Sequence, residues 1–170
     1  MFLRSLLLSL LLAGLAHADI RVLDDTGAAV HLTAPARRIV SLAPNITENL
    51  YAAGAGKHLV GAVDYSDYPD AAKRLPSVGA YSSPDLEAIV ALKPDLVVAW
   101  QSGNPAAVID KLRGLGLTVY LTEAGRLDDI PDSIEKFGRL AGSAAEAAAT
   151  ATALRQRLAR LRAQHGGRPK

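Results

Sequence analysis

The sequence predicts an α/β fold in which a mostly parallel sheet carries helices on both faces. Short apolar runs alternate with helix-length segments through residues 39–142, a pattern typical of strand–helix–strand units with right-handed crossovers. The run Leu-Val-Val-Ala at 96–99 is apolar throughout. Such a strand is buried on both faces, as strands of parallel sheets are. We therefore expect one α/β lobe between an N-terminal β-hairpin and a long C-terminal α-helix.

Residues 1–18 have the features of a secretory signal peptide. Arg4 supplies the positive charge, a leucine-rich segment follows, and Ala16-His17-Ala18 offers small residues for cleavage. The apolar segment is shorter than the roughly 20 residues of a membrane span. The sequence contains no cysteine, so it provides no disulfide, no thiolate metal site and no acceptor for a lipid anchor. We expect a mature chain that begins at Asp19 and is soluble in the periplasm.

Turn and capping signals place the strands and helices of the expected lobe, residues 19–142. The expected strands are a hairpin at 20–32 and four apolar runs: 39–42, 59–63, 96–100 and 118–122. The expected helices start near polar residues or prolines and stop at glycine or before proline. Asn45 and Glu48 have the spacing of a capping box at the first helix start. The four helices are expected from Asn45 to Gly54, from Ser83-Pro84 to Lys93, from Asn104-Pro105 to Gly114 and from Ile130 to Gly142.

The last segment, residues 143–165, predicts one long helix. Ser143 and Glu146 have the spacing of a capping box, and the alanine-rich run that follows gives a helix about 33 Å long. Only a narrow apolar stripe runs along it: Leu154, Leu158 and Leu161. A helix of this kind packs lightly and is suited to cross from one lobe to another, while an ordinary surface helix with a frayed end remains the alternative.

The charge of the chain does not indicate a nucleic-acid-binding protein. The formal net charge is +2 and the pI is near 9.0, but the excess is concentrated at the C-terminal end. It comes from Arg155, Arg157, Arg160, Arg162, Arg168 and Lys170. Without interleaved aromatic residues or a known module, this run is a solvated helix face, and no nucleic-acid partner is expected.

Aromatic and polar residues follow the expected parallel strands at the points where those strands end. Asn45 follows the first strand, Tyr65 and Tyr68 follow the second, and Trp100 follows the third; Tyr81 lies in the segment before Ser83. Ligands of open α/β sheets bind beyond the carboxyl ends of the strands. Aromatic faces at this edge suit a bulky, flat, largely uncharged ligand better than a small anion.

Motifs for catalysis or metal binding are missing from the sequence. His31, His58 and His165 have no HExxH or similar spacing, and no GxSxG nucleophile motif occurs. Gly54-Ala55-Gly56-Lys57 lacks the first glycine of a phosphate loop and ends a helix instead of opening one. We therefore expect neither catalytic residues nor a bound metal or cofactor.

Three strings in the sequence resemble the periplasmic cobalamin-binding proteins of vitamin importers, within the wider group of helical-backbone receptors for iron chelates, haem and cobalamin. The strings are RIVSLAPN at 38–45, DYSDYP at 64–69 and IVALKPDLVVAW at 89–100. The first is shared across the wider group, whereas the tyrosine turn and the tryptophan at the strand end resemble the cobalamin branch. The resemblance covers residues from about 20 to 170.

The resemblance implies a substrate-binding component of an ABC transporter, which captures cobalamin or a related corrinoid in the periplasm and delivers it to the membrane permease. It implies that Tyr65 and Trp100 contact the corrin ring. Tyr81 stands where a family member has tryptophan, and Asn45 occupies a position that contacts the ligand. Glu87 matches the glutamate that docks on permease arginines. Cobalamin is then the transported ligand and not a cofactor.

The resemblance also implies a two-lobed protein in which the long helix leads into a second lobe. This sequence ends where that lobe would begin, so we expect one lobe plus the linking helix, as a fragment or a truncated product. With half of the cleft, the free energy of ligand binding should be weaker by several kcal/mol. The alternatives are an iron-siderophore or haem receptor, an interaction module that docks through Glu87 without ligand, and a secreted hydrolase.

Overall fold

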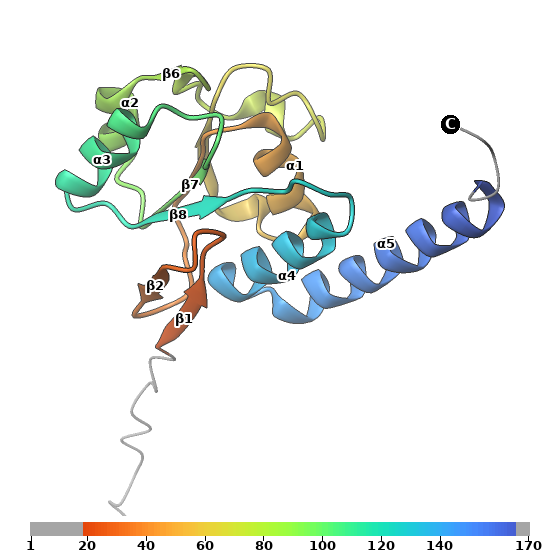
Figure 1. Ribbon diagram of the computed structural model, residues 1–170. Helices are drawn as coiled ribbons and strands as arrows, with labels where there is room; N and C mark the ends of the chain where they lie inside the picture. The colour runs from red at the N-terminus through yellow and green to blue at the C-terminus, as the bar shows by residue number, and fades with distance from the viewer. Residues whose placement is uncertain (1–18, 166–170) are drawn as a thin grey trace, which may run out of the picture.

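The computed structural model describes residues 19–165, and the expected signal peptide lies outside them. Its centre is a four-stranded parallel sheet in the order β4-β3-β7-β8 (Figure 1). The strands are β3 (Ile39–Ser41), β4 (Leu59–Ala62), β7 (Leu96–Trp100) and β8 (Val119–Thr122). β4 lies on one side of β3 and β7 on the other, so the strand order reverses between β3 and β7. The predicted parallel sheet is confirmed.

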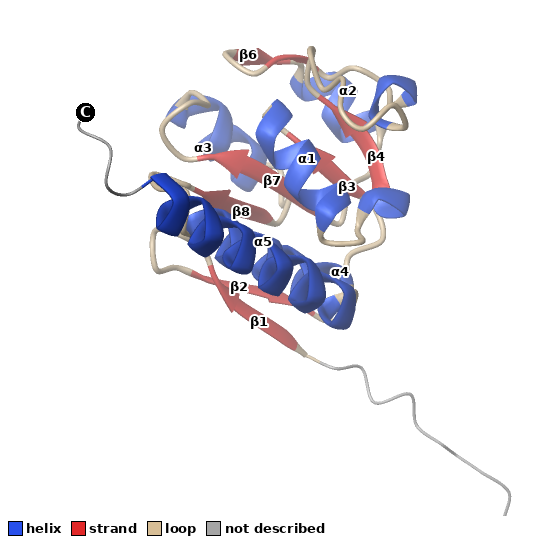
Figure 2. Ribbon diagram, turned by 90° about the vertical axis from the view of Figure 1, so that its right-hand side faces the viewer, coloured by secondary structure: helices blue, strands red, loops and turns tan. Residues whose placement is uncertain are grey.

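Helices cover both faces of this sheet because successive strand residues point to opposite sides. On one face, Ile39, Leu96 and Tyr120 pack with α1 (Pro44–Ala52), α4 (Asp129–Ala141) and α5 (Ala144–His165). On the other face, Val40, Val97 and Val119 pack with α2 (Leu86–Ala91) and α3 (Ala106–Gly114). Figure 2 shows α5 in front of the strands. Two apolar cores result, one on each side, as the α/β prediction requires.

The predicted hairpin is present and is attached to the edge of the sheet. It consists of β1 (Ile20–Leu23) and β2 (Ala29–Leu32), which pair antiparallel around a turn with Gly27 at φ +87°. The backbone N–H of Asp25 donates to the carbonyl of Leu121 at 3.0 Å, and the Asp25 carboxylate accepts the ammonium of Lys136 at 2.5 Å. These bonds fix the hairpin against β8 and α4.

The first helix begins earlier than the sequence predicted. Ala43 is the N-cap, no side chain caps the helix, and Pro44 is its first residue. The predicted capping box of Asn45 and Glu48 is therefore wrong. Proline is well suited to the first helical position because the N–H that it lacks would have no partner there. Asn45 consequently lies within the first turn, where its side chain is exposed.

The next two helix starts also differ from the predictions. Asp85, and not Ser83, caps α2, because its carboxylate accepts the N–H groups of Glu87 at 2.9 Å and Ala88 at 3.1 Å. Ser83–Pro84 instead form the short strand β6, which pairs with β5 (Gly79–Ala80). α3 begins at Ala106, and its N-cap is Pro105. The two remaining elements are short 3₁₀ turns, at Gly56–His58 and Ala72–Arg74.

The final two helices form an antiparallel pair, with α4 ending at Gly142 as predicted. α5 has 22 residues, but only Ala147 and Ala151 on it are buried. Further along, exposed ion pairs join α5 to α4 and the turn before it: Arg155 with Asp132 and Glu135, and Arg162 with Asp128. The helix extends past the rest of the lobe (Figure 1). Within residues 19–165, no helix is long and apolar enough to cross a membrane.

Candidate functional site

The candidate site lies at the carboxyl edge of the sheet, where the strand order reverses between β3 and β7. In open α/β sheets this switch point leaves a crevice in which ligands bind. Trp100 is the last residue of β7, Asn45 is in the first turn of the helix that follows β3, and Tyr65 comes soon after β4. The predicted site residues therefore follow strand ends at one edge.

Trp100 and Tyr81 are brought together at this edge. Their ring centroids are 6.1 Å apart and the ring planes are tilted by 43°, a geometry in the favourable range for aromatic pairs. The Tyr81 side chain is 44% exposed and Trp100 is half-buried, so the pair is available to a ligand. Gly103 lies directly against the indole, and a Cβ atom there would overlap it. The lack of a side chain at 103 thus allows this position of Trp100.

Asn104 holds the pair in place, although the sequence pattern indicated only a helix start for it. Its side chain is 5% exposed and makes three hydrogen bonds. Its amide oxygen accepts the backbone N–H of Trp100 at 2.6 Å, and its amide nitrogen donates to the carbonyls of Leu42 at 2.9 Å and Tyr81 at 2.8 Å. One buried amide therefore joins the end of β3, the segment before β6 and the end of β7.

Glu123 is a second residue that the sequence reasoning missed. Its carboxylate accepts the Trp100 indole N–H at 3.3 Å and the backbone N–H of Ser102 at 2.9 Å. Burial by itself would raise the pKa of Glu123, but the hydrogen bonds from Ser102 and Trp100 outweigh it and keep the pKa below its usual value. The carboxylate therefore stays ionised and keeps the indole edge oriented.

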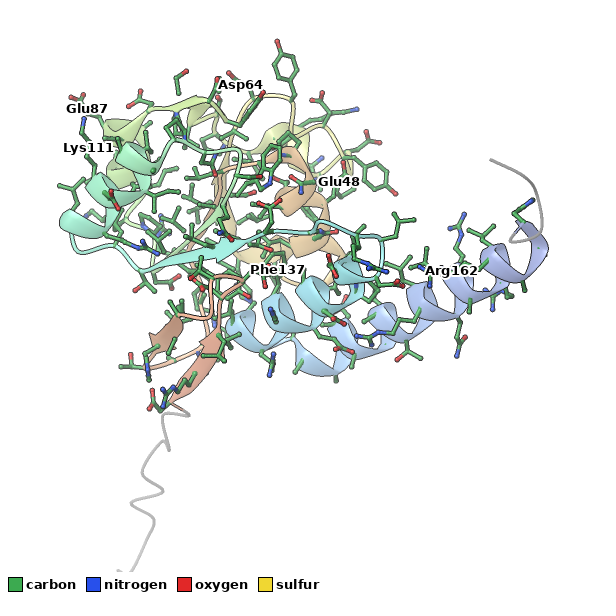
Figure 3. All side chains as sticks on the ribbon, viewed as in Figure 1. Glu48, Asp64, Glu87, Lys111, Phe137 and Arg162 are labelled. Carbon is green, nitrogen blue, oxygen red and sulfur yellow. The ribbon has the colours of Figure 1, made fainter. Side chains whose placement is uncertain are left out.

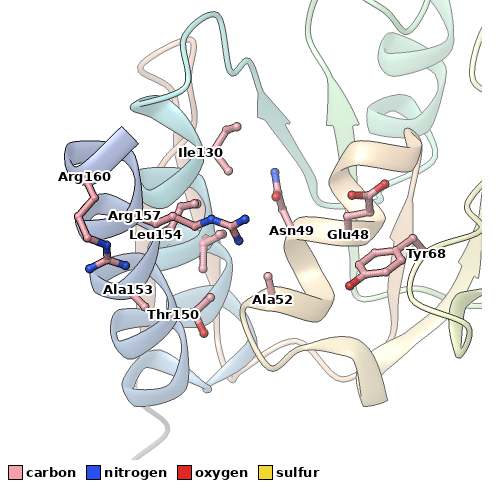
Figure 4. Close-up of a pocket in the computed structure, with 11 residues that line it drawn as sticks. Glu48, Asn49, Ala52, Tyr68, Ile130, Thr150, Ala153, Leu154, Arg157 and Arg160 are labelled. Carbon is pink, nitrogen blue, oxygen red and sulfur yellow. The ribbon is translucent and has the colours of Figure 1, made fainter. Parts of the chain in front are cut away.

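Tyr65 and Tyr68 project from the segment that follows β4. Tyr65 has φ +64° and is 82% exposed; a non-glycine residue in this region of φ is uncommon and points to a local constraint. Its neighbour Ser66 is buried and is hydrogen-bonded to Thr47 of α1 at 3.1 Å. The buried serine anchors the loop to the first helix, so the Tyr65 ring faces solvent. Tyr68 is exposed and lines a groove beside α1 (Figure 4).

Glu87 lies in the first turn of α2 and is exposed. Figure 3 shows it at the opposite end of the molecule from Arg162 of α5. It is thus available to a partner surface. Among the described residues, no group of three or more histidines, cysteines, aspartates and glutamates is arranged to hold a metal ion.

The sequence matches a known protein family over most of its length. The model of the family described as "Periplasmic binding protein" matches residues 39–170. The chain belongs to this family. Vitamin B12-binding proteins are among its curated relatives: one from Vibrio vulnificus is 42% identical over 137 residues, and one from Vibrio cholerae is 44% identical over 131 residues. These matches cover 81% and 77% of this chain but 50% and 48% of the two relatives. The chain therefore spans about half the length of these vitamin B12-binding proteins.

Solved structures of the family agree with the fold. The periplasmic vitamin B12 binding protein BtuF of Vibrio cholerae superimposes with a TM-score of 0.75 at 44% identity, over 78% of this chain and 52% of that one. A periplasmic heme binding protein from Pseudomonas aeruginosa gives a TM-score of 0.68 at 32% identity, over 74% of this chain and 45% of that one. The α/β lobe is therefore a fold that these binding proteins share.

Proposed function

We propose that this chain forms one lobe, residues 19–142, and the linking helix, residues 143–165, of a periplasmic substrate-binding component of an ABC importer that captures cobalamin. The observation that carries the proposal is the Tyr81–Trp100 pair, held at the switch point by Asn104 and Glu123. The vitamin B12-binding relatives support the choice of ligand. In this proposal the exposed Glu87 docks the lobe on permease subunits.

The chemistry of the edge fits a corrin ring. A corrin is broad, flat and bordered by amide side chains, so it presents an apolar face to aromatic rings and hydrogen-bonding groups around its rim. Tyr81 and Trp100 supply aromatic area at low entropic cost because each has only two side-chain torsions. The exposed amide of Asn45 and the phenol of Tyr65 add polar partners.

A direct test is the titration of the purified chain with cyanocobalamin. Trp100 is the only tryptophan, so its indole N–H gives a single NMR signal that the bound ligand would shift. One lobe supplies part of a cleft, and we expect a dissociation constant weaker than micromolar. Equilibrium dialysis follows the variants without the Trp100 signal. In it, Trp100→Ala, Tyr81→Ala and Tyr65→Ala should each weaken binding by about tenfold, as expected when an aromatic contact worth about 1.4 kcal/mol is lost.

Tyr68→Ala is the matched control, because this tyrosine is also exposed but lines the groove beside α1. Cobalamin binding that is insensitive to Trp100 and Tyr81 would contradict the proposed site. The second candidate is a haem receptor, which the 32% identical heme binding protein and the exposed Tyr65 phenol favour. A haem receptor would instead give a Soret shift that depends on a tyrosine or histidine ligand.

A further inference from the structure

The β1–β2 hairpin contains two adjacent aspartates whose side chains bond in different directions. Asp24 closes the turn of the hairpin itself. Its carboxylate accepts the backbone N–H groups of Thr26 at 2.9 Å and Ala28 at 3.0 Å, and the Thr26 hydroxyl at 2.6 Å. The side-chain bonds of Asp25 instead reach out of the hairpin, to the end of β8 and to α4, which lie beside it (Figure 1). One aspartate therefore serves the turn, and the other serves the neighbouring elements.

The Asp25 carboxylate holds the chain at the point where β8 ends. Its Oδ2 accepts the hydroxyl of Thr122 at 2.9 Å and the backbone N–H of Glu123 at 2.7 Å. Its Oδ1 accepts the ammonium of Lys136 at 2.5 Å. The side chain is only 15% exposed, and hydrogen bonds to a charged group are strong where little water competes for them. The carboxylate is thus fixed from two elements, and it fixes the backbone of Glu123.

Glu123 is the residue that holds the Trp100 ring. Trp100 lies opposite Thr122 in the β7–β8 pairing, so Glu123 leaves the sheet beside the indole. Its carboxylate accepts the indole N–H at 3.3 Å and the backbone N–H of Ser102 at 2.9 Å. The indole bond is slightly longer than the usual N–H···O range of about 2.7–3.2 Å. A small displacement of the Glu123 backbone would therefore break it.

We propose that Asp25 is a positioning residue of the ligand edge, which acts through Glu123 to orient the Trp100 indole. The hairpin is then part of the binding site, in addition to covering the apolar core with Val22 and Val30. Lys136 neutralises the Asp25 carboxylate, so that this charge repels the nearby Glu123 carboxylate less. The orientation of the indole is a property of the free chain. Its consequence for ligand capture rests on the proposed function.

The decisive test is a double-mutant cycle read from the indole N–H signal of Trp100 in NMR spectra of the ligand-free chain. Asp25→Ala should shift this signal in the same direction as Glu123→Ala, because both variants take the carboxylate away from the indole. When Glu123 is already alanine, Asp25→Ala should cause no further shift, since the residue through which it acts is gone. A purely structural role of Asp25 would move the signal in both backgrounds. That outcome, or an unshifted signal in Asp25→Ala, overturns the proposal.

Asp24→Ala is the matched control, because it also removes three carboxylate hydrogen bonds from the same hairpin. Asp24 is 3% exposed, so its loss should lower the free energy of unfolding in urea at least as much as the loss of Asp25. The Trp100 signal should nevertheless stay at its wild-type position. If either alanine variant fails to fold, Asp24→Asn and Asp25→Asn replace the pair. Asp25→Asn loses the ionic bond to Lys136 and should give a smaller shift in the same direction. Equal shifts at the two positions, or none at Asp25, contradict the proposal.

The consequence for ligand binding is measured by equilibrium dialysis with cyanocobalamin. Asp25→Ala should weaken binding about threefold, which is less than the loss expected for Trp100→Ala, because the ring remains but is no longer held. Asp24→Ala should bind as the wild-type chain does. If the wild-type chain binds no cyanocobalamin, the proposed function fails, and the NMR cycle still decides whether Asp25 acts through Glu123. Wild-type binding that Asp25→Ala leaves unchanged would show that Asp25 does not serve the ligand edge.

Discussion

The carboxyl edge of the sheet and the outer half of α5 are stabilised in different ways. At the edge, the buried amide of Asn104 joins three chain segments. Trp100 donates two hydrogen bonds there, from its backbone N–H to Asn104 and from its indole N–H to Glu123. The outer half of α5 has no buried residue beyond Ala151; apart from the half-buried Leu154 and Leu158, it is joined to the lobe by ion pairs of partly exposed side chains. Buried, fully satisfied polar networks fix one geometry, whereas exposed ion pairs contribute little and are screened by salt. The edge is therefore preorganised for a ligand, whereas the outer half of α5 is held to the lobe only weakly.

The largest effect should follow from Asn104→Ala at the edge. The substitution leaves buried backbone groups without partners, including the carbonyl of Leu42, and each such group costs about 1–3 kcal/mol. We expect the free energy of unfolding to fall by about 3 kcal/mol in urea denaturation. Gln101→Ala, an exposed neighbour, should change it by less than about 0.5 kcal/mol. Equal effects of the two substitutions would show that Asn104 does not hold the edge together.

Local sequence could not reveal the role of Asn104 or Glu123. The amide of Asn104 bonds a carbonyl 62 residues away, and Glu123 accepts the indole of a residue 23 positions earlier. An asparagine before a proline is an ordinary helix-start signal, and the helix does begin within two residues of Asn104; the pattern gave no sign of the three buried hydrogen bonds of its side chain. Trp100 and Tyr65 were easier to place, because residues that follow parallel strands must emerge at one edge of the sheet.

The next largest effect should come from the inner half of α5. Ala147 lies so close to Gly138 of α4 that a Cβ atom on the glycine would overlap it. In Gly138→Ala, overpacking costs about 2 kcal/mol, while the better helix propensity of alanine returns about 1 kcal/mol. A net loss of about 1 kcal/mol should appear in urea denaturation. Gly114→Ala on α3 is the matched control, since nothing lies within 4 Å of the added atom; it should be neutral or stabilising.

The strands and the helix ends could be predicted from local sequence, whereas the helix starts could not. Burial on two faces gives β7 its unbroken apolar run, and glycine stops such as Gly142 mark helix ends unambiguously. At the starts, several residues compete within a few positions. Asp85 caps α2 in place of Ser83 because Ser83 belongs to β6 and pairs with β5. This tertiary constraint is not visible in the sequence nearby.

A small effect is expected in the outer half of α5. Arg155→Ala removes contacts to Asp132 and Glu135, but the three side chains remain between 37% and 63% exposed to solvent. The melting temperature should change little more than in Arg160→Ala, which removes an arginine without an ion pair in the described residues. Any difference between the two variants should vanish at high salt, where exposed ion pairs are screened. A large, salt-resistant loss in Arg155→Ala would mean that the outer helix is as firmly fixed as the edge.

The smallest effect is a pH dependence confined to the edge. The pKa of Glu123 is lower in the folded protein than its ordinary value of 4.5, because hydrogen bonds from Ser102 and Trp100 outweigh the effect of burial. The stabilisation by its carboxylate is thus fully present above pH 4.5 and is lost as the pH falls through the lower folded-state value. The Trp100 indole N–H signal should shift over this acidic range. Glu123→Gln should remove the shift while keeping an oxygen acceptor for the indole.

Glu135→Gln is the control: hydrogen bonds from Arg155 lower the pKa of Glu135 as well, but its protonation occurs on α4 and should leave the Trp100 signal unchanged. If the shift persists in Glu123→Gln, a different titrating group acts on the indole, and Glu123 does not set its orientation.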